Sequence, residues 1–186
     1  MTLTLASLAL GTAPSTSQAA GTELPAAEKG HLAQIADTYL QRRADAVTLS
    51  RSQGVGDAAP LALTAQAADE LGGEIAALQD NARALEERGS GFSHAEVTVT
   101  SGKSTVRGDT ATLAVEEETR LYFADIQEGD AITHTSYVLP HTLTFKRAAD
   151  GAWKLADDRT PDYGSGPAAP TQLRASPARD QASRSA

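Results

Sequence analysis

The apolar side chains of this chain change their spacing near Phe92, and this change limits the folds open to the chain. Before Phe92 they recur every three or four residues, which is typical of helices with one buried stripe. After Phe92 they recur every second residue, which is typical of strands with one buried face. Because every helical pattern precedes every strand pattern, we predict an α+β fold. It has N-terminal helices packed on one face of an antiparallel sheet of about four strands.

Two helices are expected before the sheet. The first carries an apolar stripe that begins at Leu32, and the second carries a stripe that begins at Leu71. The glycine- and proline-containing segment 54–60 separates them. Gly89 stands where a left-handed C-cap favours glycine. The members of the two stripes are Leu32, Ile35, Ala36, Tyr39 and Leu40, then Leu71, Ile75, Leu78, Ala82 and Leu85.

The first two strands are predicted to form a hairpin at Gly108-Asp109. A two-residue turn there places Val106 opposite Ala111 on one face of the sheet. Val97 has an odd position and Val106 an even one, so strict alternation would turn them to opposite faces. A β-bulge near Gly102 would bring both onto the same face, and we expect one there.

Composition excludes several chemistries. The chain of 186 residues contains no cysteine, which rules out disulfides, thiolate metal ligands and a cysteine nucleophile. Its 24 acidic and 16 basic side chains give a formal net charge of −8. This charge argues against broad binding to nucleic acid or to an anionic membrane. Aromatic side chains make up only 4%, so Ala, Leu, Val and Ile must build most of the core.

The two ends are predicted to lie outside the folded domain. Residues 1–19 contain a short apolar run and then Ser17-Gln18-Ala19, which supplies the small residues Ser17 and Ala19 at the −3 and −1 positions that signal peptidase requires. We therefore expect a signal peptide and a secreted protein, although no Lys or Arg precedes Lys29 and a flexible apolar tail is the alternative. The run is too short to anchor the chain in a membrane. Residues 20–159 form a single domain, and the Pro/Ala/Ser-rich residues 160–186 are expected to be disordered.

Short motifs in the strand region carry a resemblance to a known family. They are Gly-Asp-Thr-Ala-Thr-Leu at 108–113, Glu-Thr-Arg-Leu-Tyr at 118–122, His-Thr-Leu-Thr-Phe-Lys-Arg at 141–147 and Asp-Gly-Ala-Trp-Lys-Leu at 150–155. Over about residues 28–159 the chain resembles the region that precedes the catalytic module of secreted actinobacterial amidase-domain proteins. That region is similar to the cystatin-like cones of the nuclear transport factor two superfamily. A Pro/Ala/Ser-rich segment stands where the amidase module follows in that family. The resemblance therefore implies that the antiparallel sheet is curved and cone-like and that the protein is secreted, and it carries over no catalytic residue.

One pair of side chains on the predicted apolar face has the chemistry of a general base. If the connection between the two long strands is centred on Gly129, Glu117 lies opposite His141, with Cβ atoms roughly 5 Å apart. A carboxylate at this distance orients an imidazole, so Glu117 and His141 are the candidate catalytic residues. One alternative places the pair at the open rim of the sheet, bonded only to one another or to water. Another is a slipped register that pairs Glu117 with Leu139.

The register centred on Gly129 also predicts which residues line a concave pocket. It pairs Thr119 with Leu139, Leu121 with Tyr137 and Leu113 with Phe145. The predicted lining consists of Thr119, Leu121, Tyr137, Leu139 and Trp153.

We expect no cofactor and no metal ion. His31 is assigned to the first helix, His94 to a loop before the first strand, and His134 to the solvent face. No two histidines on one element have the spacing of metal ligands. Glu116-Glu117-Glu118 is typical of a solvated strand, with a loose calcium site as the alternative. No phosphate-binding loop is found.

Two function classes fit these observations. The first is a secreted, non-catalytic binding or accessory module, for a small apolar ligand or for a protein partner. The alternative is a small pocket enzyme (an isomerase, cyclase or hydrolase) that uses Glu117 and His141. A remnant of an amidase-domain protein without a function of its own is a third hypothesis. No nucleic acid is expected as a partner, and the sheet offers a surface for a homodimer.

Overall fold

The computed structural model describes residues 21–49, 60–127, 129–161 and 169–172. The element order is α1 (Ala26–Asp45), α2 (Ala65–Glu86), β1 (Phe92–Arg107), β2 (Thr110–Phe123), β3 (His134–Arg147) and β4 (Trp153–Arg159). The four strands form one antiparallel sheet in the order β1-β2-β3-β4, so each strand pairs with its neighbour in the sequence. The predicted α+β fold is confirmed.

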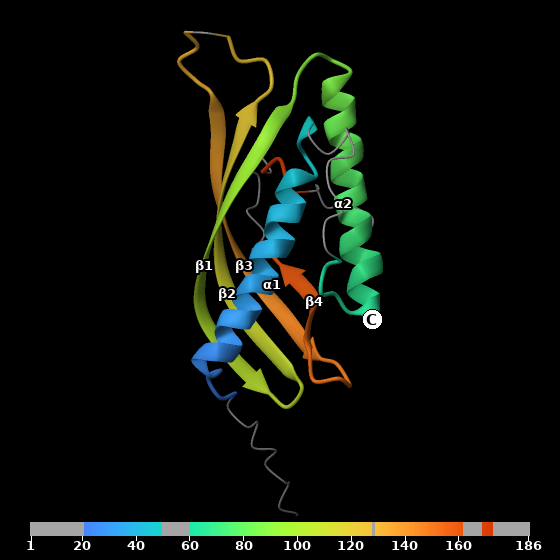
Figure 1. The fold of residues 1–186 in the computed structure, drawn as a ribbon, viewed down its shortest axis with the longest axis vertical. Coiled ribbons are helices and arrows are strands. Elements are labelled where there is room, and N and C mark those ends of the chain that lie inside the picture. Colours follow the sequence, from blue (N-terminus) through green and yellow to red (C-terminus); the bar gives the residue numbers. More distant parts are fainter. Residues whose placement is uncertain (1–20, 50–59, 128, 162–168, 173–186) are drawn as a thin grey trace, which may run out of the picture.

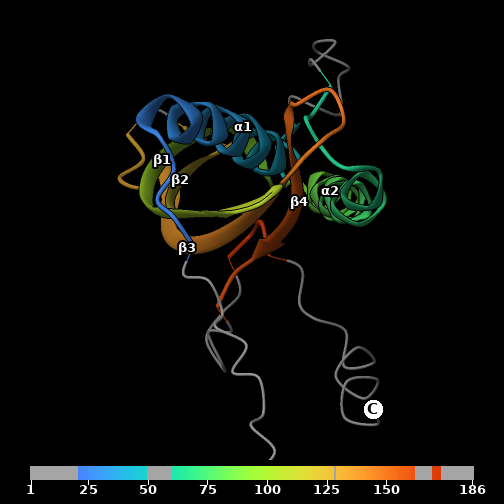
Figure 2. The ribbon, with the colours of Figure 1, turned by 90° about the horizontal axis from the view of Figure 1, so that it is seen from below.

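The sheet is curved, and α1 lies along its concave face (Figure 1). Seen from below, the strands wrap around α1, whereas α2 lies beside β4 (Figure 2). The stripe predicted for α1 is buried against the sheet, and it continues to Arg43 and Ala44. The strands contribute Leu113, Leu143, Phe145 and Leu155 to the same core. The curvature therefore lets one helix bury its stripe against several strands at once.

The second helix ends as its sequence predicts, and its start is set by a cap that was not predicted. The side chain of Thr64 caps it by accepting a hydrogen bond from the backbone N–H of Ala67 at 3.2 Å. Leu71 and Leu78 of the predicted stripe are buried. Beyond the helix, Gly89 has a φ of +72°, as expected for a left-handed glycine.

Short segments outside the strands pair with the two edges of the sheet. Residue 63 forms a parallel bridge with residue 155 in β4. On the other edge, Thr22 and Thr48 each bridge to one end of β1, at Val106 and at Phe92. Both outer strands are therefore paired in part on their outer side.

The hairpin of β1 and β2 has the predicted geometry. Val106 pairs with Ala111, and the register shifts between Ser101 and Ser104. This shift is the bulge predicted near Gly102. A Cβ on Gly102 would lie 3.3 Å from a backbone oxygen of β2, so the bulge brings two backbones close together at a residue without a side chain.

The predicted register of β2 against β3 is wrong by two residues. Glu117 pairs with Leu139, and His141 pairs with Val115. The slipped register considered as an alternative is thus the one observed. The other pairs shift in the same way, to Thr119 with Tyr137, Leu121 with Thr135 and Leu113 with Leu143. Residues 124–133 connect the strands, and a connection of this length does not set a register as a two-residue turn does.

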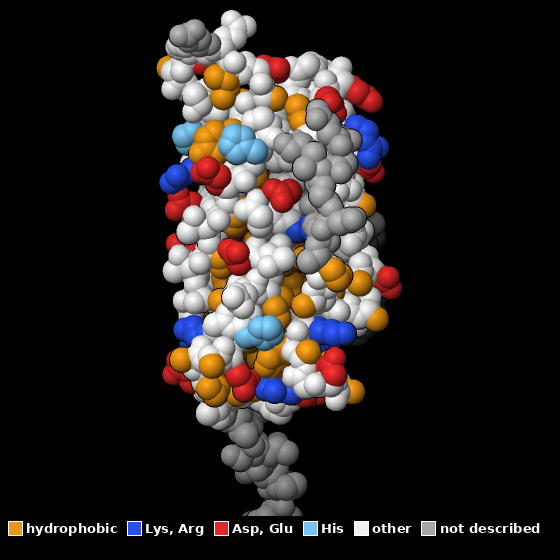
Figure 3. Space-filling model, viewed as in Figure 1, with side chains coloured by type: hydrophobic (Ala, Val, Ile, Leu, Met, Phe, Trp, Pro, Cys, Tyr) orange, Lys and Arg blue, Asp and Glu red, His pale blue; other side chains and the backbone are white. Residues whose placement is uncertain are grey.

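Two of the exposed histidines lie on the sheet, and the third, His31, lies on α1. His134 is exposed, as predicted, whereas His94 belongs to β1 and not to a loop. The ring of Tyr122 stacks on His94 with centroids 4.2 Å apart and lies 5.3 Å from the ring of His134. On the face drawn in Figure 3, acidic and basic side chains are interspersed and do not form one charged patch.

Some predictions fall on parts of the chain that the structure does not describe. The signal peptide at residues 1–19, most of the break at 54–60 and most of the tail at 160–186 lie outside the described residues. Within the described residues, no helix has both the length and the apolar character needed to cross a membrane.

Candidate functional site

The candidate pair Glu117 and His141 lies inside the fold, on the concave face of the sheet. Glu117 belongs to β2 and His141 to β3, and strand alternation turns both side chains away from solvent. Their side chains are only 1% and 0% exposed. The alternative that placed the pair at an open rim is therefore wrong, because the sheet curves around these positions and α1 covers them.

The two side chains touch although their residues are not opposite one another. Nε2 of His141 lies 2.8 Å from Oε2 of Glu117. In the observed register the two residues are diagonal neighbours on one face, a separation of roughly 7–8 Å that long side chains can span. The contact behind the catalytic hypothesis is therefore present. The catalytic role itself stays a prediction.

A second carboxylate, Asp158 from β4, holds the other side of the imidazole. Its Oδ1 lies 2.8 Å from Nδ1 of His141. Its Oδ2 accepts hydrogen bonds from Nη1 of Arg43 at 2.9 Å and from the hydroxyl of Tyr39 at 3.1 Å. Tyr39 and Arg43 are four residues apart on α1 and so share a face. Asp158 therefore joins α1 to β3.

Three hydroxyl groups complete the network. Oε1 of Glu117 accepts hydrogen bonds from Thr119 at 2.5 Å and from Tyr137 at 3.3 Å. The hydroxyl of Tyr137 also lies 2.6 Å from that of Thr171. We call this set the buried polar cluster; its members are Tyr39, Arg43, Glu117, Thr119, Tyr137, His141, Asp158 and Thr171.

The two carboxylates determine the charge of the imidazole. Burial alone lowers the pKa of His141, but the hydrogen bonds and charges of Asp158 and Glu117 outweigh it and raise the pKa to about 9. Burial alone raises the pKa of Asp158, but His141 and Arg43 hold it below its usual value. At neutral pH two cations, Arg43 and His141, thus face two carboxylates. The cluster buries ion pairs but no net charge.

The two tyrosines of the cluster stay neutral donors. Burial is the largest cause that raises the pKa of Tyr39, and the charge of Asp158 adds to it. Burial and the charge of Glu117 likewise raise the pKa of Tyr137. Each hydroxyl therefore keeps its proton at neutral pH and can donate it in a hydrogen bond to its carboxylate.

This arrangement leaves His141 without the features of a general base. Both ring nitrogens are bonded to carboxylates, so the protonated ring has no lone pair that could accept a proton. The imidazole of His141 also separates the carboxylates of Glu117 and Asp158. The three side chains therefore do not point at one shared position where a ligand could bind. Within the described part of the chain, no three His, Asp or Glu side chains are placed to hold a metal ion. In this structure the cluster fixes α1 to the sheet.

Sequence reasoning missed Arg43 and Asp158, for different reasons. Arg43 continues the apolar stripe of α1, four residues after Tyr39, and a charge on a buried stripe requires a buried partner. That signal was available. Strand alternation from Leu155 predicts that Asp157 faces inward, but β4 carries one extra residue against β3. This irregularity turns Asp158 inward instead, and no pattern in the sequence announces it.

Residues 169–172 differ from the prediction of a disordered tail. Their backbone forms a turn in which the N–H of Gln172 donates to the carbonyl of Ala169 at 2.8 Å. Thr171 is only 1% exposed. Composition does not predict this order, because the order comes from partners on α1 and β3 and not from apolar burial.

The residues predicted to line a concave pocket form part of the packed interior. Thr119, Leu121, Leu139 and Trp153 are buried, and Tyr137 is half-buried. Trp153 lies apart from the cluster, because its Nε1 donates to Glu28 at 3.1 Å and the guanidinium of Arg147 lies 4.3 Å from the centre of its ring.

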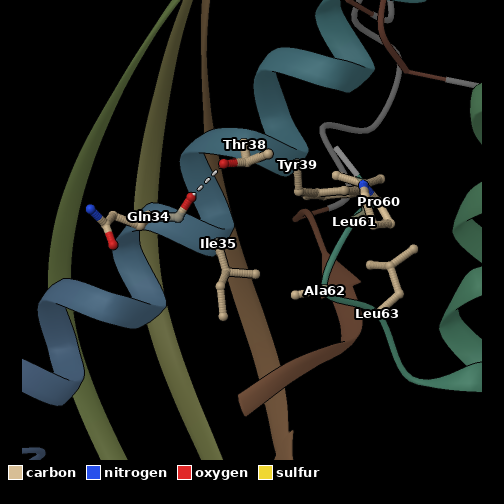
Figure 4. A pocket seen from close by; sticks show the side chains of 8 residues that line it. All are labelled: Gln34, Ile35, Thr38, Tyr39, Pro60, Leu61, Ala62 and Leu63. Atoms are coloured by element: carbon tan, nitrogen blue, oxygen red, sulfur yellow. Dashed lines mark hydrogen bonds between the residues drawn. The ribbon is translucent and has the colours of Figure 1, made fainter. Parts of the chain in front are cut away.

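An open apolar pocket lies elsewhere, between α1 and residues 60–63 (Figure 4). Its volume is about 230 Å³, and its walls are Gln34, Ile35, Thr38, Tyr39, Pro60, Leu61, Ala62 and Leu63. The hydroxyl of Thr38 is bonded to the carbonyl of Gln34 at 2.9 Å, so it is not a free donor. Tyr39 belongs to both regions, since its side chain lines this pocket while its hydroxyl bonds Asp158.

Comparison with known proteins gives only weak similarities. No protein-family model and no curated protein matches the chain. Among solved structures, the chain is similar to the intermembrane space region of the chloroplast protein ARC6, with 13% identity and a TM-score of 0.44, over 73% of this chain and 98% of that one. It is also similar to the Kfla4162 protein from Kribbella flavida, with 19% identity and a TM-score of 0.40, over 70% of this chain and 90% of that one. These scores assign no family.

Proposed function

We propose that the protein is a non-catalytic binding module whose ligand is a small apolar group held between α1 and residues 60–63. The open apolar pocket is the observation that supports this function most directly. Its volume of about 230 Å³ is below the roughly 300–1,000 Å³ of sites for drug-sized ligands. A group the size of one aliphatic or aromatic side chain suits it, presented either by a small molecule or by a protein partner.

A titration with toluene tests the pocket directly. The backbone amide resonances of Thr38, Tyr39 and Ala62 in the full chain should shift and saturate as toluene is added. Filling the pocket with Thr38→Phe should abolish the saturable shifts. The matched control is Asp37→Phe, which places the same ring on an exposed neighbouring position of α1 and should leave them intact. The proposal fails if the wild-type chain shows no saturable shift, or if both variants lose it equally.

One observation favours the alternative of a pocket enzyme, namely the contact of 2.8 Å between Glu117 and His141. Against it stand the burial of the imidazole and its second carboxylate partner. Nitrogen NMR of the His141 ring separates the two functions. A ring that stays protonated at pH 7 supports the binding module. A ring that titrates near its ordinary pKa of 6.5 supports the enzyme.

We also propose that the module acts outside the cell, as an accessory of the kind that precedes an amidase domain. The small residues of Ser17-Gln18-Ala19 after an apolar run support export. Mass spectrometry of native culture supernatant should find a mature N-terminus at Ala20, and C-terminal peptides would reveal any attached amidase module. A protein found only inside cells with Met1 intact would contradict export.

A further inference from the structure

The turn at residues 169–172 reaches the interior of the molecule from far along the chain. Pro170 occupies the second position of the turn, where its fixed φ favours this geometry. The side chain of Gln172 accepts a hydrogen bond from the backbone N–H of Ala169 at 3.0 Å, which closes the turn a second time. The turn thereby presents Thr171 to the buried polar cluster.

Two polar groups of Thr171 are recognised there. Its backbone carbonyl accepts a hydrogen bond from Nη2 of Arg43 at 3.0 Å. Its hydroxyl lies 2.6 Å from that of Tyr137. One donor from α1 and one hydroxyl from β3 thus recognise a peptide carbonyl and a side-chain hydroxyl on the same residue. This pattern is selective for threonine or serine in a peptide.

Arg43 has an unused donor at this point. Its side chain is 9% exposed, and its Nε has no hydrogen-bond partner among the described residues. Nε and Nη2 lie on the same edge of the planar guanidinium, an edge that can hold two acceptors. Thr171 fills only one of these two places. Leaving a buried donor unpaired has a cost, which indicates a site that Thr171 does not complete.

The charge of the cluster indicates which ligand belongs in this position. Arg43 and His141 already balance Glu117 and Asp158, so an anion would add an uncompensated buried charge. A neutral peptide with several carbonyl groups adds none, and it can supply the second acceptor that Arg43 lacks.

We propose that Arg43 and Tyr137 form a binding site for a peptide turn that carries threonine or serine, and that residues 169–172 occupy it as a tethered ligand. This site is separate from the apolar pocket of the proposed function, and the two can fail independently. A tethered ligand competes at an effective concentration on the order of millimolar. A free peptide therefore binds well only when the tethered turn is weakened.

The test uses the full chain and a fluorescent peptide with the sequence of residues 168–173, Ala-Ala-Pro-Thr-Gln-Leu. In one variant, Pro170→Gly combined with Thr171→Gly weakens the tethered turn without altering Arg43 or Tyr137. This variant should bind the peptide at least tenfold more tightly than the wild-type chain does. Replacing the peptide's threonine by valine should weaken binding by about tenfold, the loss of one buried hydrogen bond.

A third protein distinguishes recognition from general stickiness. With Tyr137→Phe added to the weakened variant, the threonine and valine peptides should bind alike, because the partner of the hydroxyl is gone. The proposal is overturned if the weakened variant binds neither peptide, or binds both equally while Tyr137 is present. It is also overturned if the weakened variant does not fold, since residues 169–172 would then be a structural element and not a ligand. Circular dichroism and the toluene titration show whether the rest of the chain is intact.

Discussion

Tyr39 belongs to two contrasting regions of the molecule. One buries polar groups in a closed network of hydrogen bonds, and the other leaves an apolar surface open. The hydroxyl of Tyr39 faces the buried polar cluster, where every carboxylate oxygen of Glu117 and Asp158 has a donor and no net charge remains. Its side chain also lines the apolar pocket, where surface able to hold a ligand is left open. Glu117 and His141, the titratable residues that suggest a catalytic role, thus belong to the network that holds α1 against the sheet. The open apolar surface beside this network is where we propose that an apolar ligand binds.

The largest effect should come from removing the central carboxylate of the cluster. Asp158→Ala leaves Arg43 and His141 without their shared partner, and we expect the free energy of unfolding to fall by about 3–5 kcal/mol. Urea denaturation measures this loss. The matched control is Asp157→Ala, whose carboxylate pairs with Arg159 on the surface and should cost less than about 1 kcal/mol. Equal losses would remove the distinction between the cluster and a surface ion pair.

The next effect is a pH dependence of the free energy of unfolding, which should originate in the buried polar cluster. The pKa of His141 is raised from 6.5 to about 9, so its stabilisation is complete below pH 6.5 and is lost as the pH rises through about 9. A shift of this size corresponds to a loss on the order of 3 kcal/mol. Unfolding measured between pH 6.5 and 9.5 should become easier in the wild-type chain. His141→Gln should flatten this dependence, whereas His31→Gln, an exposed control, should keep it.

A smaller effect should come from separating the two roles of Tyr39. Tyr39→Phe keeps the ring in the pocket but removes the hydrogen bond to Asp158, and we expect a loss of about 1 kcal/mol in unfolding free energy. Toluene binding should be unchanged, because the apolar surface is the same. A variant that loses toluene binding along with stability would mean that the two regions are coupled and not merely adjacent.

The smallest effect is expected at the wall of the pocket. Thr38 is exposed and its hydroxyl bonds only the carbonyl of Gln34, so Thr38→Ala should change the unfolding free energy by less than about 0.5 kcal/mol. The same urea denaturation provides the measurement. A loss comparable to that of Asp158→Ala would contradict the view that the pocket carries little of the stability.

The sequence predicts the parts of this fold that depend on periodicity. The spacing from Leu32 to Leu40 and the alternation after Phe92 identify the helix stripe and the inward strand faces, and they turn Glu117 and His141 to the same side. The predicted pair touches even though the register is shifted by two residues, because a shift by an even number preserves the face.

The parts that could not be predicted depend on breaks in periodicity and on long-range partners. The extra residue in β4 exchanges Asp157 for Asp158, and no local signal announces it. Thr171 becomes ordered through single hydrogen bonds to Arg43 and Tyr137, which the composition of its own segment cannot indicate. Arg43 is the exception, since its place on an apolar stripe was readable.

The bridges at the two sheet edges have a consequence for the protein in solution. An open antiparallel sheet offers unpaired backbone groups along both outer strands, and such strands recruit further chains and begin fibres. Here Thr22 and Thr48 lie against the two ends of β1, and residue 63 lies against β4. A strand of a second molecule that paired along the full length of either edge would have to displace these segments. In a chain with no disulfide, these bridges shorten the stretch of each outer strand that is open to pairing, and we expect them to reduce the tendency to aggregate.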